Sequence, residues 1–133
     1  MKRILSAVIL ISLLISLCSC DKYTNSFHAI GLVRSNTSHS CETSFLSLKG
    51  QLAFKIRKTE AGAEGDISYS IAVDEGEIHL YYDIYGVKEQ LAEVKAGESI
   101  DSRGGYVEGG KTVYIIIEAT EKSRGKVSVE LDN

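Results

Sequence analysis

The chain of 133 residues contains no proline and no tryptophan, and it has only three cysteines. Without proline, its turns must depend on Gly, Asp, Asn and Ser. Acidic and basic residues are well mixed at a formal net charge of −3, and the absence of a basic stripe argues against nucleic-acid binding. The glycine pairs lack the Lys-Ser/Thr ending of a phosphate-binding loop, and no G-x-S-x-G nucleophile motif occurs.

Long apolar runs are also absent, with one exception at the N-terminus. Lys2 and Arg3 precede the run 4–17, which only serines interrupt. A basic start followed by an apolar segment is typical of a secretory signal. The run is shorter than the roughly 20 apolar residues that a membrane-spanning helix needs. The pattern therefore predicts export of the chain.

The apolar run closes with Leu17-Cys18-Ser19-Cys20. This stretch resembles the lipobox of bacterial lipoproteins, in which a leucine and two small residues precede an invariant cysteine. The resemblance implies cleavage before Cys20 and a diacylglyceryl group on its sulfur. It also implies lipid anchoring in a cell membrane, on the extracytoplasmic side. An ordinary cleaved signal and an uncleaved membrane helix are the alternatives.

The leader divides the chain into three expected parts. Residues 1–19 are the signal peptide, residues 20–43 are the lipid anchor, tether and possible first strand, and residues 44–133 are one β-sandwich domain. With the leader removed and Cys20 lipidated, Cys41 is the one thiol left. An intramolecular disulfide is then impossible, so the core must supply the stability.

From residue 44 onward, apolar and polar residues alternate with the period of two that is typical of a half-buried strand. The first apolar series occupies even positions and is predicted to be buried: Leu46, Leu48, Leu52, Phe54 and Ile56. Gly50 interrupts this series and predicts a bulge or a bend between two sheets. Before it, residues 28–34 are expected to form a short strand and the polar residues 35–43 a loop.

A hairpin is expected in the middle of the chain. Residues 67–73 and 78–84 alternate around Asp74-Glu75-Gly76, which predicts a three-residue hairpin loop with Gly76 in the left-handed conformation. The next segment, 87–94, fits a strand or a helix. A strand is favoured because the segment is short and its neighbours are strands.

A second hairpin is expected at the C-terminus. Glycine-rich residues 97–110 predict strand fragments and loops, and residues 113–117, apolar on both faces, predict a central strand. A turn at 121–125 then leads to a last strand, 127–131. This ending resembles the closing hairpin of small jelly-roll modules such as pre-peptidase C-terminal domains. That resemblance implies a non-catalytic accessory module.

Together these segments predict an all-β fold. We expect an antiparallel β-sandwich or jelly-roll of seven to eight strands, preceded by a cleaved N-terminal signal segment.

One strand face carries the best candidate ligand surface. The odd positions of the segment 77–85 are His79, Tyr81, Asp83 and Tyr85, whose side chains would project together. Two aromatic rings beside a carboxylate and an imidazole suit a sugar, a peptide or a lipid headgroup. The alternative is a solvated sheet face on which the tyrosines make cross-strand pairs.

Two other groups of residues are weaker candidates. His28, His39 and Cys41 have the chemistry of a nucleophilic or metal site, but their spacing lacks the pairing of zinc ligands and nothing preorganises them. The acidic tip formed by Asp74, Glu75 and Glu77 lacks the spacing of a calcium loop and is better interpreted as a charged turn. We therefore predict no catalytic residues, no metal and no cofactor.

These observations predict a membrane-anchored extracytoplasmic binding module that is not an enzyme. Its partner would be an envelope protein or a glycan, although the absence of tryptophan weakens the case for a glycan. A structural or stress-related envelope lipoprotein without a specific ligand is one alternative, and a small thiol-dependent or metal-dependent hydrolase is another.

Overall fold

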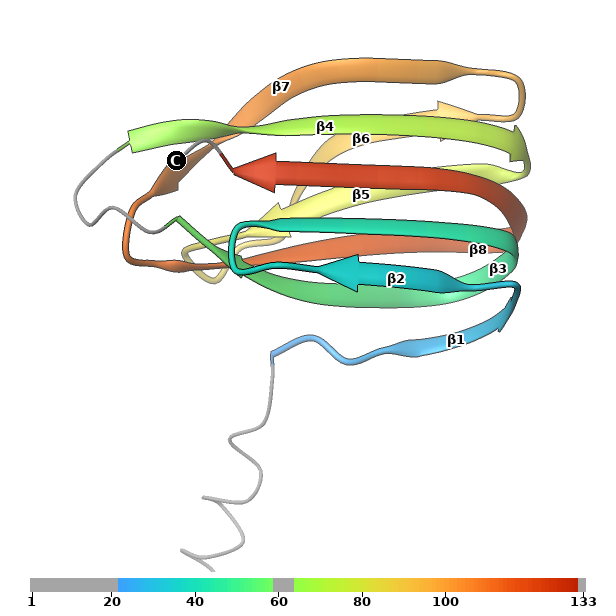
Figure 1. Ribbon diagram of the computed structural model, residues 1–133, viewed down its shortest axis with the longest axis horizontal. Coiled ribbons are helices and arrows are strands. Elements are labelled where there is room, and N and C mark those ends of the chain that lie inside the picture. Colours follow the sequence, from blue (N-terminus) through green and yellow to red (C-terminus); the bar gives the residue numbers. More distant parts are fainter. Residues whose placement is uncertain (1–21, 59–63, 132–133) are drawn as a thin grey trace, which may run out of the picture.

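The computed structural model describes residues 22–58 and 64–131, which form strands and their connections (Figure 1). In chain order the strands are β1 Ser26–Ile30, β2 Val33–Asn36, β3 Ser40–Arg57, β4 Glu64–Glu75, β5 Glu77–Asp83, β6 Glu89–Lys95, β7 Ser99–Glu108 and β8 Thr112–Leu131. All their pairings are antiparallel, which confirms the predicted fold class. The described residues contain no helix that could span a membrane. The leader and Cys20 lie outside the described residues.

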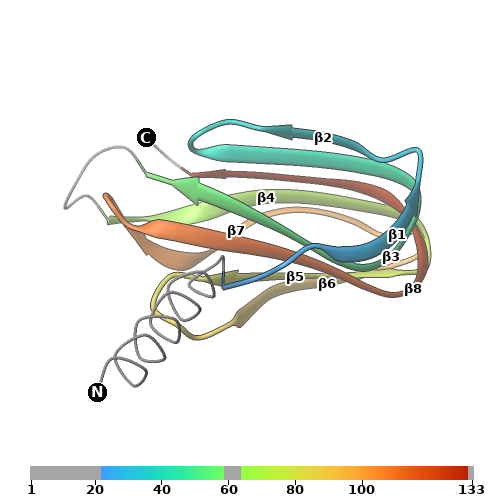
Figure 2. The ribbon, with the colours of Figure 1, turned by 90° about the horizontal axis from the view of Figure 1, so that it is seen from below.

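The strands form two stacked layers that share β3 and β8 (Figure 2). The first sheet has the order β2-β3-β8-β4-β7 and uses the N-terminal part of β3 with the C-terminal part of β8. The second sheet has the order β1-β3-β8-β5-β6 and uses the other parts of the same two strands. Both long strands bend at the end of the molecule where β1 is joined to β2. The two layers are therefore covalently continuous.

Apolar side chains from both sheets meet in one core. The members from the two middle strands, β4 and β5, are those that the alternation predicts: Ile67, Tyr69, Ile71, Val73, Ile78, Leu80 and Tyr82. From β8, Val113, Ile115 and Ile117 join this core, while Ile116 is buried on the opposite face of the strand. Because β8 is internal to both sheets, the prediction of a central strand at 113–117 is confirmed.

The burial pattern of β3 changes parity where the strand passes between the sheets. Leu46, predicted to be buried, is 58% exposed, and Phe45 fills the core instead. The pairing with β8 shifts register between Phe45 and Leu48 and again between Leu48 and Gly50. An irregularity of this kind moves all following side chains to the other face. The predicted bulge near Gly50 is thus confirmed, but the predicted burial of Leu46, which precedes both register shifts, is wrong.

The segment 35–43 is not the predicted loop. Residues Val33–Asn36 form β2, which pairs with the start of β3, so that only a short turn separates the two strands. Cys41 and Thr43 are buried and alternate with exposed Glu42. The polar composition of the segment concealed this short alternation. The sandwich accordingly includes residues 26–43.

Neither predicted hairpin forms. Gly76 does have a positive φ of 80°, but β4 pairs with β7 and β8 whereas β5 pairs with β6 and β8, so the chain changes sheets at Gly76. The expected turn at 121–125 is the bend within the continuous strand β8, where Ser123 is buried. The closing hairpin that resembled pre-peptidase C-terminal domains is therefore absent from this part of the chain.

The remaining strand predictions have different outcomes. Residues Glu89–Lys95 form β6, which confirms the choice of a strand over a helix. Residues 97–110 are more regular than expected, because Ser99–Glu108 form the single strand β7 at the edge of the first sheet.

Candidate functional site

Three of the four predicted site residues lie on the outer face of β5 in the second sheet. Across this face, His79 lies opposite Glu93 of β6 and Glu118 of β8, and Tyr81 lies opposite Ile116 of β8. The rings of His79 and Tyr81 stack, with centroids 6.3 Å apart and planes inclined by 10°. The structure therefore brings His79 and Tyr81 together as the alternation predicted.

Side chains of the protein itself cover Tyr81. The Lys88 ammonium lies 4.3 Å from the centroid of the Tyr81 ring and forms an ion pair with Glu118. Partial burial, together with the nearby Glu118 carboxylate, raises the pKa of Tyr81. Tyr81 is only partly exposed, so this ring packs within the sheet face and offers little area to a ligand.

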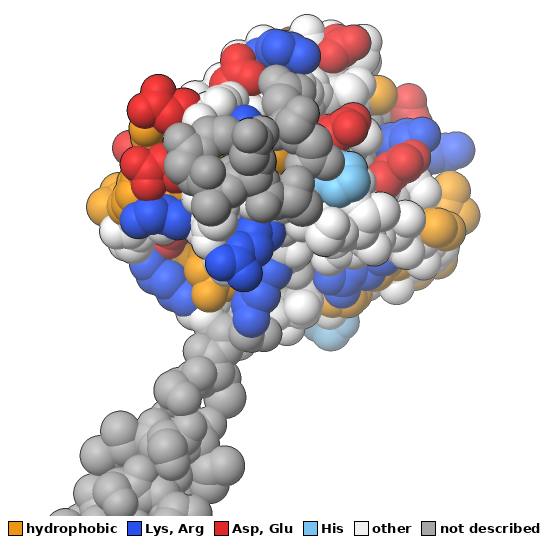
Figure 3. All heavy atoms as spheres, turned by 60° about the vertical axis from the view of Figure 1, so that its left-hand side comes forward, with side chains coloured by type: hydrophobic (Ala, Val, Ile, Leu, Met, Phe, Trp, Pro, Cys, Tyr) orange, Lys and Arg blue, Asp and Glu red, His pale blue; other side chains and the backbone are white. Residues whose placement is uncertain are grey.

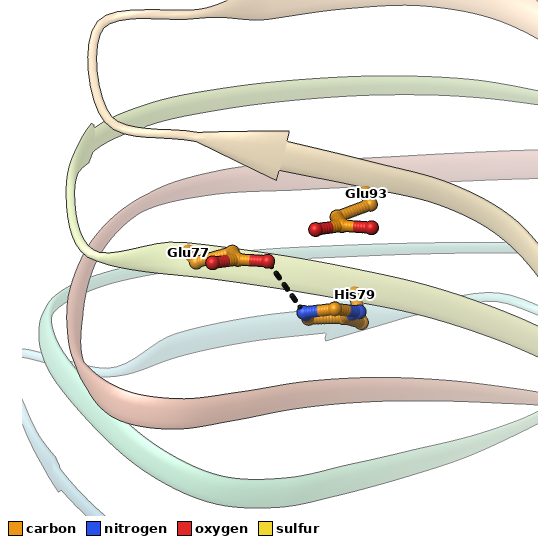
Figure 4. Close-up of side chains that lie close together, drawn as sticks. All are labelled: Glu77, His79 and Glu93. Atoms are coloured by element: carbon orange, nitrogen blue, oxygen red, sulfur yellow. Dashed lines mark ion pairs between the residues drawn. The ribbon is translucent and has the colours of Figure 1, made fainter.

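Beside it, Glu77, His79 and Glu93 form a compact group of potential ligands on β5 and β6 (Figure 4). His79 Nε2 lies 2.9 Å from Glu77 Oε1, and one ligand atom from each of the three residues lies within 4.8 Å of the others. A hydrogen bond with Glu77 and the charges of His79 and Lys95 lower the pKa of Glu93. Glu77 had been predicted to lie in a charged turn, apart from His79.

Asp83 points outward from β5 but is only 1% exposed. Its carboxylate pairs with Lys22 Nζ at 2.8 Å and accepts hydrogen bonds from the Tyr23 hydroxyl at 2.6 Å and the Gly86 N–H at 2.7 Å. Burial by itself would raise the pKa of Asp83, but these three partners outweigh it and hold the pKa below its usual value. Asp83 thus fastens the segment before β1 to the end of β5.

Tyr85 lies beyond the end of β5, in a different setting from His79 and Tyr81. Tyr85 is 53% exposed, and Lys111 Nζ lies 4.9 Å from the centroid of its ring. Nearby on β7, Tyr106 is 41% exposed and donates a hydrogen bond of 3.0 Å from its hydroxyl to Glu64. We call Tyr85 and Tyr106 the tyrosine pair.

Two carboxylates connect the tyrosine pair. Glu64 and Glu108 are direct cross-strand partners on β4 and β7. A hydrogen bond with Glu64 raises the pKa of Tyr106 to about 12. Partial desolvation raises the pKa of Tyr85, and a hydrogen bond with Glu108 raises it further. Both hydroxyls therefore stay protonated at neutral pH, beside carboxylates that can accept further hydrogen bonds.

The tyrosine pair lies at the end of the sandwich opposite the bends of β3 and β8. Figure 3 turns this end forward and shows acidic and basic side chains interspersed over its visible part. Lys111, which lies over Tyr85, is also 3.7 Å from Glu108. Two exposed aromatic rings, two carboxylates that accept hydrogen bonds and one ammonium group that donates them thus lie in one place. Sites that bind polar ligands with apolar faces combine groups of the same kinds.

The sequence pattern identified Tyr85 but not its partners. Tyr106 lies between two glycine pairs, and this composition predicted loops instead of the regular strand β7. Glu64 is brought to Glu108 by a pairing of strands far apart in the chain. Alternation within one segment gives no information about such a pairing.

The predicted alternatives based on Cys41 have little structural support. Cys41 is 3% exposed in β3, and this burial raises its pKa to about 12 despite the nearby Arg34. A protonated thiol in the core is a poor nucleophile and a poor metal ligand. His28 lies on β1 and His39 in the turn before β3. In the predicted acidic tip, Asp74 Oδ2 lies 3.8 Å from Arg124 Nε of β8.

Comparison with known proteins leaves the ligand open. No family model and no curated protein matches the sequence. Among solved structures, the fold is similar to a family 29 carbohydrate-binding module complexed with mannohexaose, at 10% identity and TM-score 0.44 over 84% of this chain and 83% of that chain. It is similar to a carbohydrate-binding module from Cellvibrio mixtus lichenase 5A, at 12% identity and TM-score 0.40 over 80% and 91%.

A cupin-2 domain protein from Shewanella frigidimarina is also similar, at 12% identity and TM-score 0.33 over 86% of this chain and 88% of that chain. Similarity at these identities and TM-scores assigns neither a ligand nor an activity to the present chain.

Proposed function

We propose that the protein is a non-catalytic binding module, held by a lipid on Cys20 at the extracytoplasmic side of a membrane, and that it binds a glycan through the tyrosine pair. The observation that carries the ligand site is the exposure of Tyr85 and Tyr106 beside Glu64 and Glu108. The lipid anchor is proposed from the Leu17–Cys20 sequence.

The chemistry of the tyrosine pair suits a sugar. The C–H face of a pyranose ring packs on an aromatic ring, and its hydroxyl groups both donate and accept hydrogen bonds. Glu64 and Glu108 can accept from the sugar, and the Lys111 ammonium can donate to it. A non-catalytic role fits the burial of Cys41, which leaves the most reactive side chain of the domain protonated in the core.

The ligand site is tested by titrating the protein with a panel of neutral oligosaccharides, including manno-, cello- and galacto-oligomers, and following binding by calorimetry. We expect Tyr85→Ala and Tyr106→Ala each to weaken the binding by at least about tenfold, a change of roughly 1.4 kcal/mol. Tyr81→Ala is the matched control, because its ring is already covered by Lys88. Equal loss in all three variants, or no saturable binding to the panel, would contradict the proposed glycan site.

The anchor is tested separately by the intact mass of protein purified from membranes. We expect a species that lacks residues 1–19 and carries the mass of a diacylglyceryl group, and we expect this added mass to be absent from Cys20→Ala. An unmodified wild-type chain would contradict the anchor but would leave the glycan site standing, because the tyrosine pair does not depend on Cys20.

A further inference from the structure

We propose that Glu77, His79 and Glu93 form a surface site for one divalent transition-metal ion, with Zn²⁺ as the ion of choice. The site lies on the outer face of the second sheet and is separate from the tyrosine pair. It rests on the geometry of two paired strands and is independent of the proposed glycan binding.

Strand geometry brings the three ligands together. Glu77 and His79 are two residues apart on β5, so their side chains leave the same face of the sheet. Glu93 lies directly opposite His79 on β6. Directly opposed residues have Cβ atoms roughly 5 Å apart, which is short enough for an imidazole and a carboxylate to reach one ion.

The distances between ligand atoms are close to those of a bound ion. Zinc–ligand bonds of roughly 2.0–2.2 Å separate tetrahedral ligand atoms by about 3.5 Å. Here His79 Nε2 and Glu77 Oε1 are 2.9 Å apart, and one ligand atom from each of the three residues lies within 4.8 Å of the others. Small side-chain rotations of Glu93, which is exposed, would complete a three-ligand arrangement.

The nature of the ligands selects the class of metal. One imidazole with two carboxylates suits zinc, copper or nickel, whereas calcium and magnesium prefer oxygen ligands alone. Three protein ligands also leave a coordination position open to water or to an exogenous group.

The imidazole is already oriented for binding. The His79 side chain is 20% exposed and its ring stacks on Tyr81, which restricts its rotation while Nε2 faces Glu77. Lys95, the cross-strand partner of Glu77, adds a positive charge nearby and should keep the affinity moderate.

The test is a Zn²⁺ titration of the protein without a histidine tag, followed by calorimetry and by the NMR signals of the three histidine rings. We expect one ion per chain, broadening or shifting of the His79 signals, and at least about tenfold weaker binding in His79→Ala and in Glu93→Gln. Glu93→Gln keeps the size of an exposed side chain, so it reports on the ligand and not on folding.

His39→Ala and His28→Ala are the controls, because they remove the other two imidazoles and should leave the affinity unchanged. A tenfold excess of Ca²⁺ or Mg²⁺ should not displace Zn²⁺. Failure to bind Zn²⁺, unchanged binding in His79→Ala, or loss of binding in His39→Ala would overturn the proposal. None of these outcomes bears on oligosaccharide binding by the tyrosine pair.

Discussion

At the scale of single residues, Asp83 has the clearest energetic role. A buried carboxylate is costly unless charged and hydrogen-bonding groups surround it. Lys22, Tyr23 and the Gly86 N–H supply such groups, and the Tyr23 ring also packs 5.4 Å from the ring of Tyr114. Asp83 was predicted as part of a ligand face, but its oxygens already bind groups of the protein itself.

We expect Asp83→Asn to lower the free energy of unfolding by about 2 kcal/mol at pH 7, because it removes the charge that Lys22 and Tyr23 bind. The lowered pKa of Asp83 gives the effect a definite pH dependence. Its contribution is present above the unfolded-state pKa of roughly 4 and is lost as the pH falls through the lower folded-state value. Urea denaturation of both proteins at pH 7 and at pH 3 measures this difference.

The exposed residue Asp101 on β7 provides the control. Asp101→Asn should change the stability by less than about 0.5 kcal/mol at either pH. A difference between wild type and Asp83→Asn that stays constant from pH 7 to pH 3 would show that the carboxylate charge is not responsible.

Cys41 illustrates a residue whose burial was not predicted. Its polar neighbours, among them His39 two positions before it, indicated a loop with a free thiol and no catalytic role. In β3, however, the side chain of Cys41 enters the core together with Thr43 and Phe45. The alternation C-x-T-x-F was present in the sequence, but only a strand pairing with Val127 and Val129 makes it a buried face.

At the scale of elements, the passage from β4 to β5 depends on Gly76. Its φ of 80° is in the left-handed region, and a Cβ atom there would lie 2.2 Å from Ser123 Oγ and 2.7 Å from the Lys122 carbonyl oxygen. Ser123 in turn accepts a hydrogen bond from the Glu77 N–H and donates to nearby carbonyl groups. A side chain at residue 76 would therefore strain the point at which the chain changes sheets.

Gly97 offers a matched comparison, because its φ is 84° but a Cβ atom would meet nothing within 4 Å. We expect Gly97→Ala to cost about 1–2 kcal/mol of stability from the backbone conformation alone. Gly76→Ala should cost a further 1–3 kcal/mol or so, because the methyl group also overlaps β8. Thermal or urea denaturation of the two variants measures the difference, and equal destabilisation would contradict the tight packing at Gly76.

The strands were more predictable than their pairing. Alternation predicted the buried faces of β4, β5 and the second half of β3, because burial of one face is a local property of a strand. The same Asp-Glu-Gly sequence can close a hairpin or carry the chain between sheets, and local sequence does not distinguish the two. Residues 121–125 are polar, which predicted a turn, but β8 only bends there, and Ser123, Arg124 and Gly125 are paired with β3 or β4.

The same limit applies to the candidate sites: residues within one segment could be predicted, but their neighbours on other strands could not. Two of the three proposed metal ligands and one of the two exposed tyrosines lie in the segment 77–85, which sequence analysis had already identified. Glu93, Tyr106 and Glu64 come from other strands. Their positions beside this segment depend on pairings that are set by the whole core.

At the scale of the whole molecule, β3 and β8 join the two sheets into one unit. Each of these strands is hydrogen-bonded in both layers, so the two layers cannot separate unless hydrogen bonds of both sheets break. The two ends of the sandwich differ in chemistry. The end where β3 and β8 bend has three exposed apolar side chains, Ile30, Val33 and Leu46, and the opposite end has the tyrosine pair.

The fastening of Lys22 to Asp83 has a consequence for reach. Lys22 is the second residue after Cys20, and two residues of extended chain span at most roughly 7 Å. A Cβ atom on Gly86, the residue after Tyr85, would lie 3.5 Å from Lys22 Nζ. A lipid on Cys20 would therefore hold the turn at Tyr85 close to the membrane. The protein would then bind only ligands that lie at the bilayer surface.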